Sequence, residues 1–338
     1  MSTSTSTAPR PQAGAPDPAG TPGPSSGVRL GFGRVLRSEW IKFRSLRSHW
    51  ILLVVALLLS LGFAALGAWS TTTTQAINEQ MAQEQVDAML EGRSPEELGL
   101  TEEEVQQQRD EFVVQSEQQM AEGSGLALPD GMTFSEYLAM TSANGGLQLV
   151  MLLLGALAVL FIGSEYATRS IQTTMTAVPR RTPVLLAKVV VLSVAALLFG
   201  VLSALLCHLL VQPLLAGADL GYDVLQEAVL LNVLAVGLFY MITAWMGFGL
   251  GALLKSTTWG IVVLVVLLLV LEGVLFALSF EWLEDLKPYS PTSAGAQFTS
   301  VYQPSDAVLN HLESGLVYGA WGVLFVLAGI LVTRRRAL

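Results

Sequence analysis

Long apolar stretches alternate with polar segments along the whole chain. Six of these stretches each hold 19 or more mostly apolar residues. A helix of that length crosses a bilayer core of about 30 Å. The pattern therefore predicts six membrane-spanning helices, at about 50–69, 144–163, 189–212, 228–254, 258–279 and 315–333.

The basic residues lie on alternate sides of these stretches. Fifteen of the 18 Lys and Arg residues fall before the first stretch, between the second and third, between the fourth and fifth, or after the sixth. Short loops rich in Lys and Arg stay in the cytoplasm. We therefore expect an all-α polytopic protein of the cell membrane, with six transmembrane helices and both termini cytoplasmic.

The parts outside the predicted spans differ in composition. Residues 1–27 are mainly Ser, Thr, Pro, Ala and Gly, with no aromatic residue, which is typical of a disordered tail. We expect this tail to be cytoplasmic and residues 28–338 to form the transmembrane domain. Fifteen of the 27 acidic residues lie between Glu79 and Glu136, so the formal charge of −9 mainly reflects one acidic external insertion at 70–143.

Helix signals indicate that this insertion is helical. Pro95 follows Ser94 as a first helical residue, and Thr101 with Glu104 fits a capping box. The pattern is compatible with a small helical hairpin or with long extensions of the first two spans. The acidic residues lack the spacing of a calcium loop and are interpreted as a solvated face.

A basic amphipathic segment precedes the first span at residues 32–49. Its apolar residues recur every three to four positions, and polar residues fill the remainder. This pattern predicts a helix lying in the inner membrane interface, in contact with the lipid bilayer, although basic residues there could also serve only to orient the chain. The residues assigned to this helix surface are Arg34, Arg37, Glu39, Trp40, Lys42 and Arg44.

The connections between later spans have distinct lengths. Residues 164–188 form an inner loop in which Glu165 to about Thr174 favour a short helix, and span three is expected to begin after Pro183. Lys255–Thr257 predict a tight inner turn. Residues 280–314 are long enough for one or two short external helices that dip into the interface.

Motifs for catalysis and for cofactor or metal binding are absent from the sequence. There is no phosphate-binding G-x-x-x-x-G-K-[ST] loop, and His49, His208 and His311 are not at metal-site spacing. Cys207, the single cysteine, cannot form an intrachain disulfide and is interpreted as a packing residue. We expect no enzymatic activity, no cofactor and no nucleic-acid partner.

Two ionisable residues lie inside predicted spans, where charge is costly. Glu272 in span five could line a transit path or could fix that helix to a neighbour by a hydrogen bond. His208 in span three is a possible partner for Glu272. Glycines in Gly247-x-Gly249-x-Gly251 and Gly315-x-x-x-Gly319 mark expected close helix contacts.

Two segments resemble a known family. RVLRSEWIKFRSLRSHWILL before span one and GSEYATRSIQTTMTAVPRRTPVLLAK between spans two and three are similar to the ABC-2 type permeases of actinobacterial ABC exporters. The resemblance covers about residues 30–338 and includes the six-span layout, but the 70–143 insertion is longer than expected for that family.

The resemblance implies a partner and a mechanism. Two permease subunits, identical or related, would pair, and each would dock a separate ATP-binding cassette ATPase on its cytoplasmic face. The segment from Glu165 to Thr174 would be the coupling helix, beside the interfacial helix. The ATPase-coupling residues would be Glu165, Tyr166, Arg169, Arg180 and Arg181, although the arginines could instead act on topology alone.

The function expected from these observations is that of a permease subunit of an ATP-driven exporter. Its spans carry few charges, which favours amphipathic or apolar cargo. Two alternatives remain open: a secondary transporter, for which we see no inverted repeat, and a non-transporting scaffold or immunity-type protein acting through its external insertion.

Overall fold

The structure is a computed structural model that describes residues 31–335, apart from 91, 125–127, 129–130, 168–180, 279 and 304–306. The predicted tail at 1–27 and most of the predicted coupling segment lie outside these residues. Every regular element in the described part is helical. Six helical segments are long and apolar enough to cross a membrane, as the hydrophobic pattern predicts.

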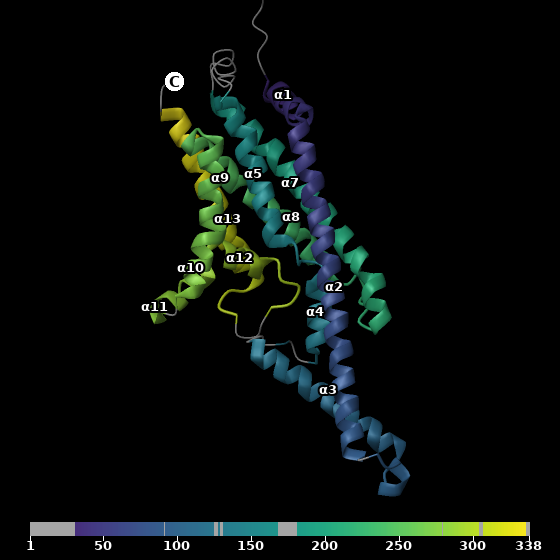
Figure 1. Cartoon of the computed structure of the whole chain (residues 1–338). Coiled ribbons are helices and arrows are strands. Elements are labelled where there is room, and N and C mark those ends of the chain that lie inside the picture. Colours follow the sequence, from purple (N-terminus) through teal and green to yellow (C-terminus); the bar gives the residue numbers. More distant parts are fainter. Residues whose placement is uncertain are drawn as a thin grey trace, which may run out of the picture.

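The first span is part of a much longer helix. α1 (Phe32–Ser45) leads into α2 (Arg47–Leu90), whose 44 residues extend about 66 Å at 1.5 Å per residue. A short turn, η1 (Pro95–Leu98), connects it to α3 (Glu102–Ser124), which packs back against α2. Figure 1 shows α2 and α3 reaching beyond the bundle, so the insertion combines a hairpin with an extension of span one.

Capping boxes begin two helices of the insertion. The backbone N–H of Thr101 donates to Glu104 Oε2 at 2.8 Å, and the Glu104 N–H donates to Thr101 Oγ1 at 3.2 Å. This confirms the predicted start of α3. A second box, Thr133 with Glu136, caps α4 (Phe134–Ser142), which leads through a turn into α5 (Leu147–Ala167).

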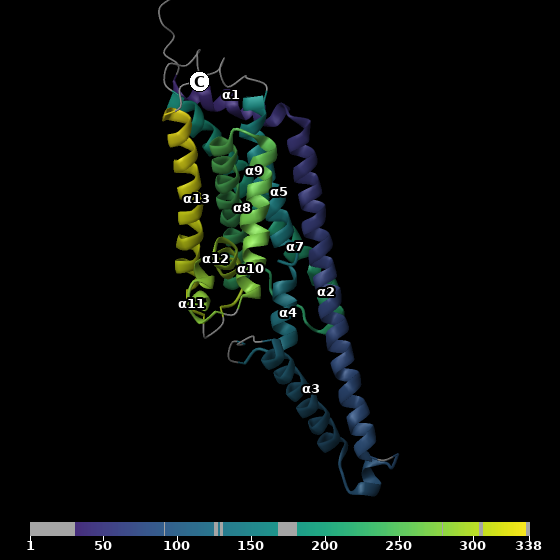
Figure 2. The same cartoon turned by 60° about the vertical axis from the view of Figure 1, so that its left-hand side comes forward.

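α8 is the central helix of the bundle. It spans Glu227–Leu254 and packs against α5, α7 (Arg181–Leu215) and α13 (His311–Arg335), as Figure 2 shows. α2 packs on α7, α4 and α5 at the side. Buried residues make up 61% of the apolar window of α8 but only 17% in span five, which lies at the periphery.

Span five is not a uniform α-helix. It consists of α9 (Thr257–Val265), a π-helical turn at Val266–Val270 and α10 (Leu271–Ala277). Lys255 has φ 49° and Ser256 caps α9, so the predicted tight turn is present. Beyond α10 the chain forms α11 (Glu281–Glu284), η4 (Lys287–Tyr289) and α12 (Pro291–Phe298); η2 (Ala216–Ala218) follows α7. The predicted short helices of this segment are therefore present.

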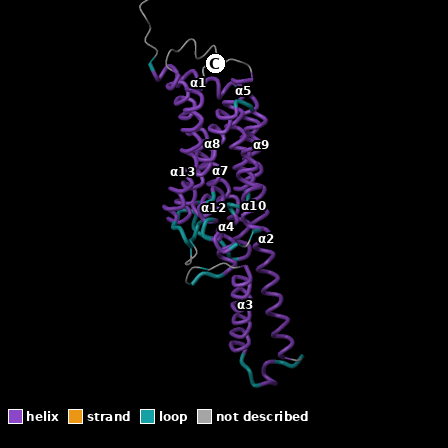
Figure 3. Tube along the Cα trace, turned by 90° about the vertical axis from the view of Figure 1, so that its left-hand side faces the viewer, coloured by secondary structure: helices purple, strands orange, loops and turns teal. Residues whose placement is uncertain are grey.

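The first and last described helices end at the same side of the bundle. Figure 3 shows α1 and the C-terminal end of α13 at one end, opposite the protruding α2–α3 hairpin. The six spans lie between these two helix ends, and an even number of crossings agrees with their common side. We call the end that carries α1 the α1 end.

Candidate functional site

A buried lysine occupies the α1 end of the bundle. Lys188 lies in the third turn of α7 and its side chain is fully buried. Its Nζ donates to Glu39 Oε2 of α1 at 2.5 Å and to Glu165 Oε1 of α5 at 2.7 Å. A charged group of this kind is tolerated inside protein only when it is paired and hydrogen-bonded. Lys188 therefore connects three helices that lie far apart in the sequence.

Lys42, a partly exposed residue of α1, contacts both of these glutamates. Its Nζ donates to Glu39 Oε1 at 2.8 Å and to Glu165 Oε1 at 3.2 Å. Partial burial alone would lower the pKa of Lys42, but the hydrogen bond to Glu39 and the charge of Glu165 outweigh it, so its pKa is raised. We call Glu39, Lys42, Glu165 and Lys188 the charge network; its formal charges cancel.

The local sequence explains how Glu39 enters this network. Val35, Glu39 and Phe43 are buried and spaced by four residues, so they share one face of α1. Phe43 packs edge-on against Phe161 with ring centroids 5.5 Å apart, and Lys188 Nζ lies 4.8 Å from the Phe161 centroid. The Phe161 ring therefore contacts both Phe43 of α1 and the ammonium group of Lys188.

The last turn of α5 contacts two further elements. The hydroxyl of Tyr166 lies 3.1 Å from Thr333 Oγ1 of α13, and Lys255 Nζ lies 5.9 Å from the centre of the Tyr166 ring. Glu165 Oε2 is buried and has no hydrogen-bond partner among the described residues. The end of α5 is therefore a junction for α1, α7, α13 and the turn between α8 and α9.

The predicted coupling residues are only partly placed by the structure. Glu165 and Tyr166 belong to the last turn of α5 rather than opening a separate short helix, because the helical pattern of span two continues without a break to Ala167. Arg169 and Arg180 lie outside the described residues. Arg181 begins α7, so this helix starts before Pro183, whose position in the first turn costs no intrahelical hydrogen bond.

The predicted surface of α1 is divided between two environments. Arg34, Arg37, Trp40 and Arg44 are exposed. Glu39 is buried and Lys42 is half-buried, so these two contact the bundle instead of the surroundings. The sequence places Lys188 among the inner charges. The local signal for its burial is its position four residues beyond Val184, on the same helix face, between the apolar residues Ala187 and Val189.

His208 belongs to a polar cluster at the opposite end of the bundle. Its Nδ1 lies 2.7 Å from the hydroxyl of Tyr222, and its Nε2 lies 2.9 Å from Oδ1 of Asn232. The side-chain amides of Asn232 and Asn144 both donate to the carbonyl of Thr299, at 2.5 and 3.1 Å. This cluster fastens the C-terminal end of α12 to α8 and to the start of α5.

Glu272 has different partners from His208, so the suggested pairing of the two is wrong. The Glu272 carboxylate accepts hydrogen bonds from the hydroxyls of Ser290, at 2.8 and 3.1 Å, and of Ser293. Thr292 Oγ1 donates to the carbonyl of Leu268 inside the π-helical turn at 3.0 Å. The π-helical turn and Glu272 therefore both accept hydrogen bonds from the start of α12 and fix its position.

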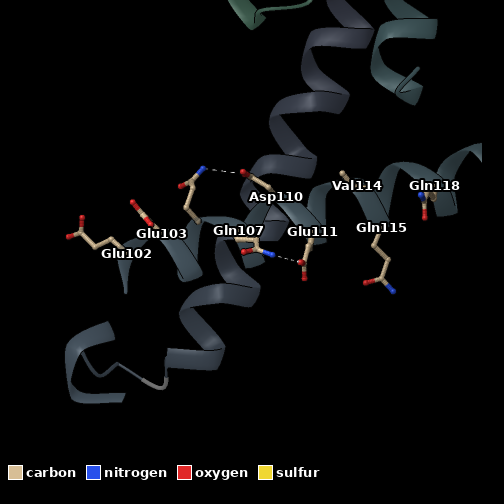
Figure 4. Close-up of a pocket in the computed structure, with 9 residues that line it drawn as sticks. Glu102, Glu103, Gln107, Asp110, Glu111, Val114, Gln115 and Gln118 are labelled. Carbon is tan, nitrogen blue, oxygen red and sulfur yellow. Dashed lines mark hydrogen bonds between the residues drawn. The ribbon is translucent and has the colours of Figure 1, made fainter. Parts of the chain in front are cut away.

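Other sites that could hold an ion were considered. In the described part of the chain, no three His, Cys, Asp or Glu side chains group in a way that could hold a metal. Four acidic residues of the insertion, Glu102, Glu103, Asp110 and Glu111, line one face of α3, where Gln107 donates to Glu111 at 3.1 Å, as Figure 4 shows. All residues of that face come from a single helix, which agrees with a solvated surface.

One comparison with known proteins, against family models, matches most of the chain. No curated protein and no solved structure matches it. Residues 34–332 match the model of the family described as ABC-2 family transporter protein, a stretch that includes nearly all of α1, the first five spans, most of the sixth span and the charge network. The chain therefore belongs to the ABC-2 transporter family and is a multi-pass membrane component of a transporter.

Proposed function

We propose that the chain is the permease subunit of an ATP-driven exporter of the cell membrane. In this proposal both termini and the α1 end face the cytoplasm, where a separate ATP-binding cassette ATPase docks, and a second permease copy or a related chain completes the complex. Cargo is amphipathic or apolar and leaves the cytoplasm. The proposal rests on the family and on the distribution of basic residues.

The single observation that carries the coupling part is the charge network. The connection at 168–180 joins α5 to α7, and residues on both sides of it, Glu165 and Lys188, form an ion pair at 2.7 Å. Glu39 links the same lysine to α1. A push on this connection by an ATPase subunit would therefore act on α1, α5 and α7 together.

Exposed groups beside the network support a docking role for the same surface. Arg34, Arg37 and Arg44 are exposed on α1 and can meet acidic residues of a partner protein or anionic lipid. The unsatisfied Oε2 of Glu165 offers an acceptor at the start of the connection. In the proposal, Arg169, Arg180 and Arg181 add the remaining positive charge of this surface.

Isolation of the full-length chain from its own membranes tests the proposal. We expect an ATP-binding cassette subunit to co-purify and the complex to hydrolyse ATP. In inverted membrane vesicles, an amphipathic dye should accumulate with ATP and not with a proton gradient alone. Accumulation driven only by the proton gradient would support a secondary transporter. Purification without an ATPase, together with no dye accumulation, would support the scaffold alternative.

A further inference from the structure

A lateral groove lies at the end of the bundle opposite the charge network. It has a volume of about 650 Å³ and is bordered by the first three turns of α8, the end of α12 and the start of α13. Figure 2 shows α12 beside α8 and α13 at this end. The volume falls within the range of about 300–1,000 Å³ that is common for small-molecule sites.

The groove has a mainly apolar lining. Leu231 and Leu234 of α8 line it and are 57% and 50% exposed, and Phe298, the last residue of α12, lines it as well. Glu227, the first residue of α8, also belongs to the lining, and its side chain is exposed. An occupant that matches this lining has an apolar chain and a compact head group.

The charged residues near the groove indicate whether that head group is cationic or anionic. The sequence has no Lys or Arg between Lys188 and Lys255, and none between Lys287 and Arg334. Among the described residues, Lys188 and Lys255 lie at the α1 end, and Lys287 pairs with Glu284 at 2.5 Å. In the described lining, Glu227 is the only carboxylate, and no Lys or Arg is present. His311 also lines the groove, and its Nε2 lies 3.0 Å from the hydroxyl of Ser300.

We propose that this groove binds a cationic amphiphile, with the apolar chain along Leu231, Leu234 and Phe298 and the ammonium group beside Glu227. Asn232, a buried residue of the lining, also belongs to the His208 cluster. An occupant therefore lies against the hydrogen bonds that fasten α12. That the bound amphiphile is cargo rests on the proposed function, but the binding itself does not.

A photolabelling experiment tests the binding. The full-length protein is placed in phosphatidylcholine nanodiscs and exposed to a dodecyl-trimethylammonium probe carrying a diazirine in its chain. Mass spectrometry should locate the label in residues 226–238 and 298–312. A dodecyl sulfate probe with the same diazirine should label these peptides several-fold less, because the described lining carries the Glu227 carboxylate and no Lys or Arg.

Two variants and one control sharpen the result. Glu227→Gln should lower labelling by the cationic probe about fivefold, the scale of one exposed ion pair. Ala228→Phe, at a half-buried position of the lining, should block both probes. Asp223→Asn removes a carboxylate from the preceding loop without touching the lining and should leave labelling unchanged.

Equal labelling by the two probes, or labelling that is insensitive to Glu227→Gln, would mean that ordinary lipid occupies the groove and would overturn the inference. Protection of these peptides on dimer formation, with no probe bound, would assign the groove to a second copy and also overturn it. The co-purification experiment above gives an independent result. An ATPase that co-purifies with a protein whose groove takes no cationic probe would overturn the inference alone. A groove that takes the cationic probe in a protein without an ATPase would overturn the proposed function alone.

Discussion

The Nζ atom of Lys188 lies 2.7 Å from Oε1 of Glu165, across the connection that separates α5 from α7. The lysine is fully buried and the glutamate nearly so. Desolvation of two such charges costs several kcal/mol each, so the pair by itself adds little net stability. It does make the relative position of the two helices depend on both charges being present.

Replacement of Lys188 by Met should destabilise the protein strongly. The variant leaves the carboxylates of Glu39 and Glu165 facing each other with only half-exposed Lys42 between them. Loss of one partner from a buried ion pair costs about 3–5 kcal/mol. Chemical unfolding of the purified full-length protein in nanodiscs measures the change.

Lys42→Met provides the matched control for that variant. Its side chain is 36% exposed whereas that of Lys188 is fully buried, so Lys42→Met should cost clearly less than Lys188→Met. A Lys188→Met variant no less stable than Lys42→Met would mean that the network does not hold the helices together.

Glu165→Gln should uncouple transport from ATP hydrolysis. The amide keeps the shape of the side chain and one acceptor, but it loses charge-assisted bonds to Lys188 and Lys42, which contribute about 1.5–3 kcal/mol each. We expect the ATPase to remain bound and dye accumulation in inverted vesicles to fall about tenfold, the equivalent of 1.4 kcal/mol.

Glu313→Gln is the control, because Glu313 is exposed at the far end of α13 and only caps that helix. Transport by Glu165→Gln at the level of this control would refute the coupling role. A complex that fails to assemble would instead assign Glu165 to docking.

Glu272→Ala should loosen α12 without unfolding the bundle. The substitution removes the acceptor for Ser290 and Ser293, whose hydroxyls hold the first turn of this helix. Hydrogen exchange should accelerate in 290–298 and stay unchanged in α8. Ser293→Ala should reproduce part of the effect. If exchange is unaltered while transport is lost, Glu272 acts on the transit path and not on α12.

The start of α3 should depend on pH through Glu104. Hydrogen bonds from the Thr101 backbone and side chain lower the pKa of Glu104 below its usual 4.5. Because the pKa of Glu104 is lower in the folded cap than in the unfolded chain, the ionised carboxylate stabilises the cap above about pH 4.5. This stabilisation is lost as the pH falls through the pKa of the folded state. Exchange at 102–106 should therefore rise below about pH 4.5.

Glu104→Gln removes the capping carboxylate and leaves Glu102 and Glu103 in place, so exchange at this helix start should lose the part of its pH dependence that comes from the cap. The same rise in Glu104→Gln would attribute the effect to another group.

The sequence was informative where the deciding interactions are local. The spans can be predicted because a helix that crosses the apolar core of a bilayer must be apolar over its length. The capping box of α3 can be predicted because Thr101 and Glu104 lie within four residues of each other. The charge network could not be found this way, since Glu39 and Lys188 are 149 residues apart. The π-helical turn was also missed, because Val266–Val270 read as an ordinary apolar run and Thr292 supplies its partner from another helix.

The glycines of α8 should differ sharply from Gly319 in their tolerance of alanine. A Cβ atom on Gly247 would lie 2.3 Å from the carbonyl oxygen of Gly155, and one on Gly249 would meet the backbone of Phe325 at 2.3 Å. No described atom lies within 4 Å of a Cβ on Gly319, so the predicted contact at that glycine does not form within the described part of the chain.

Gly247→Ala should therefore force α5 and α8 apart and cost about 1–3 kcal/mol or more, as overpacking does. Gly319→Ala should be neutral or stabilise the helix by about 0.5–1 kcal/mol, because alanine loses less backbone freedom on folding. Unfolding of both variants in the same nanodiscs compares them directly. Equal stability of the two would show that α5 and α8 are less closely packed than the 2.3 Å approach requires. A destabilised Gly319→Ala would place that glycine at a contact with a second chain, since its own chain leaves the position open.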